Sequence, residues 1–289
     1  MDKKFNENGW INGFIGVLIF SGTLPATRVA VMDFNPVFLT FARAGIAGLL
    51  ALLILLVLKE KRPSHKHLFS LTIVSICVVI GFPLLTALAL KYITAAQSLV
   101  FIGALPLFTA IFGVLRGDER PKPAFWIFSI LGCLIVIGFA LSKKLSLSPK
   151  GDILMLISII LCGLGYAEGA KLSKSVGGWQ VITWALILAL PFTAPIMIFL
   201  FPSSLSGIGI LPWIGLAYVS VFSMLIGFIF WYRGLSQGGI AAVGQLQLMQ
   251  PFIGLILAAT LLHEQLTIGM LASTIGVILC VFGAKKFAT

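Results

Sequence analysis

The sequence predicts an all-α integral membrane protein with ten transmembrane helices, arranged as two inverted repeats of five helices. The chain of 289 residues is 59% hydrophobic and only 10% charged, whereas a soluble domain carries about 25% charged residues. Its apolar residues gather in long charge-free runs, and about 20 such residues cross the hydrocarbon core of a bilayer. The second half also repeats features of the first at a spacing of 145 residues.

The charge-free runs predict the spans in order. The first ends at Arg28, and the second is interrupted only by Arg43. No charge occurs from Ser175 to Tyr232, and the turn residues Phe201-Pro202-Ser203-Ser204 divide that stretch into two spans. The N-terminal run continues past Phe20, so we interpret it as a retained span and not as a signal peptide. The expected spans are Ile11–Thr27, Val37–Leu58, Leu68–Leu90, Tyr92–Leu115, Pro123–Ser142, Gly151–Leu172, Trp179–Phe201, Leu211–Gly234, Ile240–Leu262 and Leu266–Ala284.

Basic residues set the expected orientation. With both termini in the cytoplasm, the inner side holds fourteen Lys and Arg and the outer loops hold four, which is the bias that membrane proteins show. The net charge of +11 therefore needs no nucleic-acid partner, and we expect none. The cysteines lie inside apolar runs and are interpreted as small buried side chains, neither disulfides nor metal ligands. They are Cys77, Cys133, Cys162 and Cys280.

An internal repeat divides the chain into two units, 1–145 and 146–289. At the shift of 145 residues, which we call the repeat spacing, Pro106 meets Pro251, Glu119 meets Glu264 and Gly138 meets Gly283. Each unit holds an odd number of spans, so the second must enter the membrane upside down relative to the first. Inverted repeats are typical of secondary transporters, whose halves rock around a central site.

Several motifs occur in a characteristic order along nearly the whole chain, from Gly13 to Ala284. They are Phe38-Leu39-Thr40-Phe41-Ala42-Arg43, Leu90-Lys91-Tyr92-Ile93-Thr94-Ala95-Ala96, Pro106, Tyr232-Arg233-Gly234-Leu235, Ala241-Ala242, Pro251, Glu264-Gln265-Leu266-Thr267, Gly276 and Gly283. This order resembles the EamA family of the drug/metabolite transporter superfamily. The resemblance implies ten spans around a central cavity, lined mainly by spans 1, 3, 4, 6, 8 and 9, and export of amino acids or other small metabolites.

Two arginines, Arg28 and Arg43, lie near the expected outer ends of their spans. A charge near the centre of the bilayer costs about 2.5–3.5 kcal/mol on insertion scales, unless it snorkels to the interface or faces a cavity. Either arginine could bind a substrate carboxylate, or could instead snorkel or pair, for example with Asp33. Arg28 is the stronger candidate for substrate binding, and the resemblance favours a structural role for Arg43.

Glu168 is the acid that lies clearly inside an expected span, beside Gly165 and Gly169. A glycine pair at this spacing lets a neighbouring helix approach closely. The carboxylate could couple transport to protons, or it could form a local ion pair with Lys171, three residues further along the same helix face.

Other polar side chains within the spans are candidates for substrate binding or for hydrogen bonds between helices, because amides and hydroxyls need partners in lipid. The candidates for substrate contact are Thr23, Gln97, Tyr166, Trp231, Gln247 and Gln250. Pro106 and Pro251 recur at equivalent positions and are the candidate hinges. Glu119 and Glu264 are expected to cap the helices that follow them, with a gate as the alternative.

The sequence thus predicts a secondary transporter, most consistent with an exporter of small metabolites such as amino acids, in the cytoplasmic membrane. A lipid or drug exporter of the same fold and a non-transporting membrane scaffold are the alternatives. An enzyme is not expected, because His263-Glu264 lacks the second histidine of a metal site and the chain has only three histidines. We expect no catalytic residue, cofactor or metal. The expected partners are a small-molecule substrate and membrane lipid, and both a monomer and a homodimer remain open.

Overall fold

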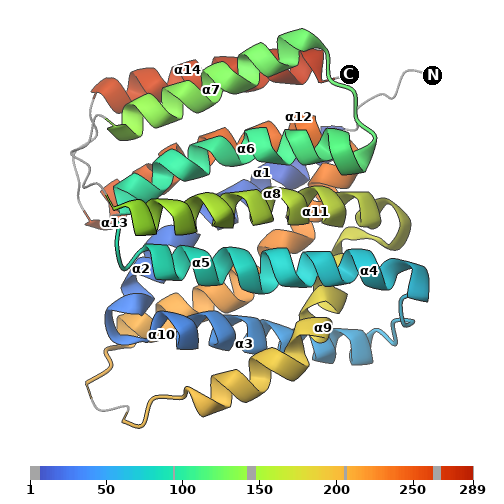
Figure 1. Ribbon diagram of the computed structural model, residues 1–289, viewed down its shortest axis with the longest axis vertical. Coiled ribbons are helices and arrows are strands. Elements are labelled where there is room, and N and C mark those ends of the chain that lie inside the picture. Colours follow the sequence, from blue (N-terminus) through green and yellow to red (C-terminus); the bar gives the residue numbers. More distant parts are fainter. Residues whose placement is uncertain (1–6, 94, 142–147, 205–206, 263–267, 289) are drawn as a thin grey trace.

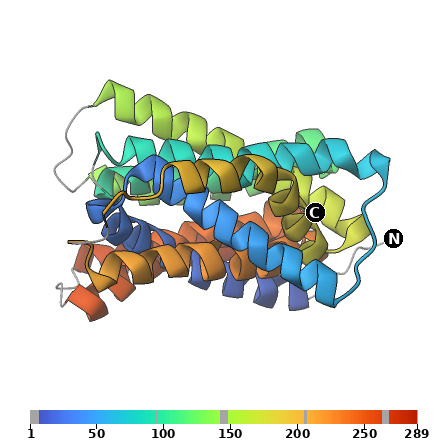
Figure 2. The same ribbon diagram turned by 90° about the horizontal axis from the view of Figure 1, so that it is seen from below.

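The computed structural model describes residues 7–93, 95–141, 148–204, 207–262 and 268–288, and in these ranges every regular element is helical. The helices run side by side along one direction, so that their connections gather at the two ends of the bundle (Figures 1 and 2). The elements of residues 7–141 are α1 (Glu7–Ser21), α2 (Thr23–Asp33), α3 (Pro36–Val57), α4 (His65–Val74), the π-helical segment η1 (Ser75–Gly81), α5 (Phe82–Ala89), α6 (Ala95–Gly117) and α7 (Pro123–Leu141).

The rest of the chain continues in the same way. Its elements are α8 (Pro149–Val176), α9 (Gly178–Phe199), α10 (Ile210–Ala217), the π-helical segment η2 (Tyr218–Ile226), α11 (Gly227–Gly238), α12 (Ile240–Gly244), the 3₁₀ segment η3 (Gln245–Met249), α13 (Gln250–Leu262) and α14 (Ile268–Phe287). Two of the three irregular segments end next to a proline, since η1 is followed by Pro83 and η3 by Pro251. Proline has no N–H to donate to the preceding turn, which favours a local change of helical pitch.

Six helical stretches in the described ranges are long and apolar enough to cross a membrane. They are Asn8–Asp33, Pro36–Val57, His65–Ala89, Pro149–Val176, Gly178–Phe199 and Ile210–Gly238. Two shorter apolar stretches are Phe101–Gly117 and Pro123–Gly138. The chain is therefore a multi-pass helical membrane protein, as the composition predicts.

The faces of α3 show how such a protein packs. Its buried residues are mostly small, such as Ala44 and Ala47, whereas the large side chains of Leu53 and Leu56 are exposed. Small residues let helices approach closely in a membrane, where lipid accepts the large apolar side chains. The exposed leucines of α3 thus lie where acyl chains would cover them.

The contact between α1 and α11 depends on glycine. A Cβ atom added to Gly9 would lie 2.5 Å from the backbone nitrogen of Gly238, and one added to Gly234 would lie 2.5 Å from that of Gly13. The clash would be with backbone, which cannot turn aside. On α8, a Cβ on Gly165 would meet Val78 and one on Gly169 would meet the ring of Tyr232, which confirms that this glycine pair admits neighbouring helices.

Both ends of the described chain lie at one end of the bundle, which we call the basic end. The ammonium of Lys285 lies 4.3 Å from the ring centroid of Trp10, and the Lys122 amide donates to the Phe287 carbonyl. The connections α3–α4, α6–α7, α8–α9 and α11–α12 are at the same end (Figure 1). Its exposed cations include Lys59, Lys61, Arg62, Lys66, Arg120, Lys122, Lys171, Lys174, Arg233 and Lys286.

One expected boundary was wrong. The first span does not end at Arg28, because the helix runs on through α2 to Asp33, whose carboxylate accepts a hydrogen bond from the Gly209 amide. An arginine close to the end of a span can extend its exposed side chain towards the interface without breaking the helix. Arg28 is exposed on α2.

Candidate functional site

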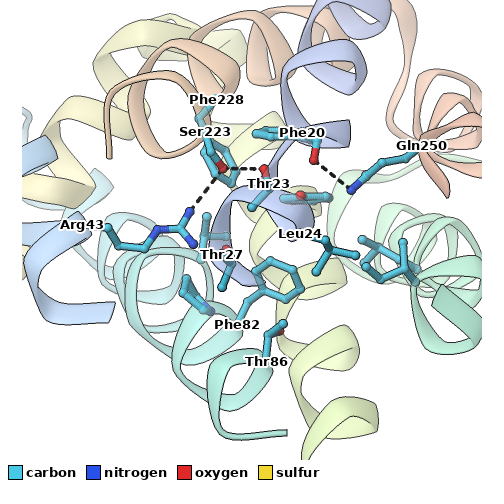
Figure 3. Close-up of a pocket in the computed structure, with 15 residues that line it drawn as sticks. Phe20, Thr23, Leu24, Thr27, Arg43, Phe82, Thr86, Ser223, Phe228 and Gln250 are labelled. Carbon is cyan, nitrogen blue, oxygen red and sulfur yellow. Dashed lines mark hydrogen bonds between the residues drawn. The ribbon is translucent and has the colours of Figure 1, made fainter. Parts of the chain in front are cut away.

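A cavity lies inside the bundle (Figure 3), and its lining residues come from the middle of the helices and from the part away from the basic end. It contains about 600 Å³ of empty space, solvent at its mouth included. Residues from α1 and α2, α3, η1 and α5, α6, α8, η2 and α11, and α13 line it. They are Phe20, Thr23, Leu24, Thr27, Arg43, Val78, Phe82, Pro83, Thr86, Ile102, Leu105, Tyr166, Ser223, Phe228 and Gln250. All six expected spans contribute, and α3 adds Arg43 to them.

Arg43 brings a positive charge into this cavity. It lies two turns into α3 and is 6% exposed. Its Nη2 donates to the Ser223 hydroxyl at 3.2 Å, and the same oxygen accepts a hydrogen bond from Thr23 at 2.8 Å (Figure 3). The Arg43 Nε has no hydrogen-bond partner in the part of the chain that the structure describes. The guanidinium is thus held in place while part of its donor capacity remains unused.

Aromatic rings form one wall of the cavity. Phe20 and Phe228 have ring centroids 4.9 Å apart, and Tyr166 lies 5.8 Å from Phe228. Trp231 stands behind this wall, with its ring 5.4 Å from Tyr166, and is fully buried. The wall can bury an apolar or aromatic part of a ligand.

The glutamines expected near the substrate divide into two groups. Gln250 lines the cavity, and its Nε2 donates to the Phe20 carbonyl at 3.4 Å. Gln245 and Gln247 are fully buried in η3, outside the cavity lining. Neither amide has a hydrogen-bond partner in the described ranges, although a buried amide without partners is costly.

Glu168 belongs to a separate polar group near the basic end. Its carboxylate accepts hydrogen bonds from the Arg116 Nε at 2.9 Å and from the Ser70 hydroxyl at 2.6 Å. Glu168 is 2% exposed. The interpretation of a local pair with Lys171 was wrong, because Lys171 is exposed and Arg116, on α6, is the partner. We call Ser70, Arg116 and Glu168 the latch, since they join α4, α6 and α8.

Glu119 caps a helix, but a different one from that expected. Its two carboxylate oxygens accept hydrogen bonds of 2.6 Å from the amides of Ile240 and Ala241, at the start of α12. The N-terminus of a helix has free N–H groups and a partial positive charge, which a carboxylate satisfies. The helix that the structure shows it to cap is α12, about 120 residues further along the chain. Glu264 lies outside the described residues.

The structure brings together some of the expected substrate-binding residues and separates others. Thr23, Tyr166 and Gln250 line the cavity. Arg28 is exposed outside it, whereas Trp231 and Gln247 are buried elsewhere in the core, and the side chain of Gln97 lies outside the described residues. The candidate hinges Pro106 and Pro251 are both buried. The residue that sequence reasoning undervalued is Arg43, although the cost of a charge at that depth was its signal.

The model of the EamA-like transporter family matches residues 8–141 and, a second time, residues 149–284. The chain belongs to this family. It is accordingly a membrane transporter of the EamA family.

Relatives agree with this assignment. The chain is 62% identical to "Uncharacterized transporter YdeK" of Bacillus subtilis over 281 residues, which are 97% of this chain and 98% of that protein. It is 26% identical to "Uncharacterized inner membrane transporter YedA" of Escherichia coli K12 over 161 residues, 55% of this chain and 52% of that one. A protein solved by crystallography superimposes with a TM-score of 0.78 at 16% identity, over 96% of this chain and 97% of that one, and so shares the fold.

Proposed function

We propose that this protein is a secondary transporter that exports small metabolites, such as amino acids, across the cytoplasmic (inner) membrane by alternating access. The observation that supports this most directly is the cavity itself. Helices from both halves of the chain line it, and it places a buried cation beside hydroxyl groups and an aromatic wall. A polar site near the middle of a helical bundle, between two halves, is the arrangement that transporters use.

In this proposal residues 1–145 and 146–289 form two inverted halves of five transmembrane helices each, ten in all. The irregular segments support the relation, because η1 (Ser75–Gly81), moved along the chain by the repeat spacing, falls within η2 (Tyr218–Ile226). The repeat spacing also separates two pairs of cavity residues, Val78 with Ser223 and Leu105 with Gln250. π-helical turns are often found at functional sites.

The packing of helices also supports the two halves. The repeat spacing makes α3 equivalent to α9 and α7 equivalent to α14. In both cases the two equivalent helices pack on each other. The contact of α1 with α11 becomes that of α8 with α5, which is present as well. A two-fold relation between the halves accounts for all of these contacts.

We take this conformation to be one in which the cavity opens towards the outside of the cell. We place the basic end in the cytoplasm, with both termini, because positive charge favours that side. The cavity then lies in the outer half, and polar contacts between the halves close the inner half. The latch joins Glu168 of the second half to Arg116 and Ser70 of the first, and Glu119 of the first half holds α12 of the second.

Glu168 is the proposed proton-coupling residue. Protonation removes the negative charge that Arg116 pairs with, and so weakens the attraction that holds the inner half closed. A proton and the opening of the inner side are thereby linked through one carboxylate. Pro106 and Pro251, buried at equivalent positions in α6 and α13, are proposed as the hinges about which these helices bend.

Exchange of the two halves also gives a role to residues outside the present cavity. The repeat spacing relates Gln247 to Ile102 and Trp231 to Thr86, and Ile102 and Thr86 both line the cavity. In the inward-open state Gln247 and Trp231 would take the places of these two residues and face the substrate. The unpaired amide of Gln247 would gain partners there.

The decisive experiment is transport by the purified protein in liposomes. Vesicles loaded with a panel of unlabelled metabolites are diluted into each labelled metabolite, and counterflow is measured. Saturable uptake of at least one compound above that of protein-free vesicles is expected. No compound exchanging above that background, with protein that is folded and correctly inserted, would contradict transport and favour a scaffold.

A further inference from the structure

The charges around the cavity are unbalanced. Arg43 is charged, and neither Asp nor Glu occurs among the described residues that line the cavity. The one salt bridge within the described ranges, between Arg116 and Glu168, belongs to the latch. A guanidinium kept in a membrane interior without a counter-ion is costly, so an anion entering the cavity would relieve that cost.

Arg43 keeps hydrogen-bonding capacity that such an anion could use. Nη2 is held by the Ser223 oxygen, while Nε has no partner in the described part of the chain. The Ser223 oxygen accepts from both Arg43 and Thr23, so the hydroxyl proton of Ser223 is not used in either bond. Guanidinium N–H groups form a planar fork that matches a carboxylate, and charge-assisted hydrogen bonds of this kind are strong.

The rest of the lining selects against a second charge on the ligand. Hydrophobic side chains and the aromatic wall of Phe20, Tyr166 and Phe228 form most of the surface. An amino acid bound through its carboxylate would leave its ammonium group with no acid among the described lining residues. An uncompensated buried charge is strongly destabilising, whereas the same molecule without the amino group would leave nothing unpaired.

We propose that Arg43 and Ser223 form a carboxylate subsite and that the preferred substrates are organic monocarboxylates with an apolar body and no amino group. This inference rests on the proposed transport function and narrows its substrates from small metabolites in general to these acids, in place of amino acids. Within that class the carboxylate binds the guanidinium and the Ser223 hydroxyl, and the apolar body lies against the aromatic wall.

Four probes with the same phenyl body separate the charges. They are 3-phenylpropanoate (anion), phenylalanine (zwitterion), phenethylamine (cation) and 3-phenylpropanamide (neutral). Their binding to the detergent-purified full chain is measured by calorimetry, without any need for transport. The 3-phenylpropanoate anion is expected to bind at least tenfold more tightly than each of the other three.

Variants then test the residues. Arg43→Gln is expected to weaken binding of 3-phenylpropanoate at least tenfold and to leave binding of 3-phenylpropanamide unchanged. Ser223→Ala is expected to weaken binding of 3-phenylpropanoate to a smaller extent. Arg28→Gln, which removes an exposed arginine, is the matched control and should change neither. If Arg43→Gln does not fold, Arg43→Lys and Ser223→Ala are used for the test instead, because both variants keep a positive charge at residue 43.

The outcomes distinguish this inference from the proposed function. Phenylalanine binding as tightly as 3-phenylpropanoate, or equal losses for anion and amide in the variants that fold, would overturn the subsite even if the protein transports other solutes. Selective binding of the anion without counterflow of any compound would instead contradict transport and leave the subsite standing.

Discussion

Arg116→Ala tests the proposal that the latch holds the inner half of the protein closed. The substitution removes the partner of Glu168 but leaves its hydrogen bond from Ser70. Truncating one member of a fully buried ion pair costs about 3–5 kcal/mol, and an exposed pair contributes about 0.2–1 kcal/mol. The Arg116 side chain is 40% exposed and that of Glu168 3%, so water screens one partner, and we place the loss between these limits, at about 1.5 kcal/mol.

That free energy corresponds to a change of about tenfold in an equilibrium constant. Because the latch exists only while the inner half is closed, its loss should raise the ratio of inward-open to outward-open protein by this factor. The matched control is Lys171→Ala, which removes an exposed cation three residues after Glu168 on α8. It should leave the ratio unchanged.

Cysteine labelling measures the ratio. The native cysteines are buried and free, and can be replaced by alanine before Leu24→Cys is introduced into the cavity lining. A membrane-impermeant maleimide added to intact cells then reports the outward-open fraction. Arg116→Ala should slow this labelling, by up to tenfold where the outward-open state is the minor one. Where the outward-open state is the minor one, labelling that stays at the rate of the parent would refute the role of the latch. Equal slowing with Lys171→Ala would refute it as well.

Three further predictions follow from individual contacts. Gly9→Ala should lower the stability of the protein in detergent by about 1–3 kcal/mol, as overpacking does, because its Cβ would meet backbone. Gly138→Ala is the control and should not lower it, because a Cβ at Gly138 would have no atom within 4 Å. Equal shifts of the thermal-unfolding temperature in the two variants would contradict the packing argument. Glu119→Gln should cost about 1 kcal/mol of stability through the α12 cap, and an unchanged unfolding temperature would argue against that cap. Gln247→Cys should react with maleimide from the cytoplasmic side during transport, whereas Leu248→Cys, buried against Gly132, should not; the same rate for both would rule out the exchange of halves.

The membrane character of the fold could be predicted because it depends on composition and run length. The expected span Trp179–Phe201 corresponds to α9 (Gly178–Phe199), and Leu211–Gly234 falls within the continuous helix Ile210–Gly238. The π-helical turns η1 and η2 were not predicted. They arise from how a helix fits its neighbours, and hydropathy does not report hydrogen-bond pitch.

The position of Arg43 shows what the sequence could not predict. Depth along a span can be counted from residue numbers, and that count places both Arg28 and Arg43 near the outer ends of their spans. The face of a helix cannot be read in the same way, because lipid-facing and core-facing positions are both apolar in a membrane protein. Only packing shows that Arg43 faces the cavity while Arg28 is exposed. The partner of Glu168 was missed for a related reason, since spacing reveals Lys171 on the same helix but not Arg116, 52 residues away.

The proposed exchange of halves changes the lining of the site between its two states. Ile102 and Thr86 line the outward cavity, and Gln247 and Trp231 would replace them inside, so a substrate would meet different partners on each side. A difference in affinity between the two faces cannot by itself drive net export, because a ligand shifts an equilibrium only by its own binding free energy. Accumulation requires a second, coupled equilibrium, and protonation of Glu168 is the one that the latch offers. Glu168→Gln should therefore retain counterflow of substrate in liposomes but lose its accumulation under an imposed pH gradient. Undiminished accumulation in this variant would place the coupling elsewhere.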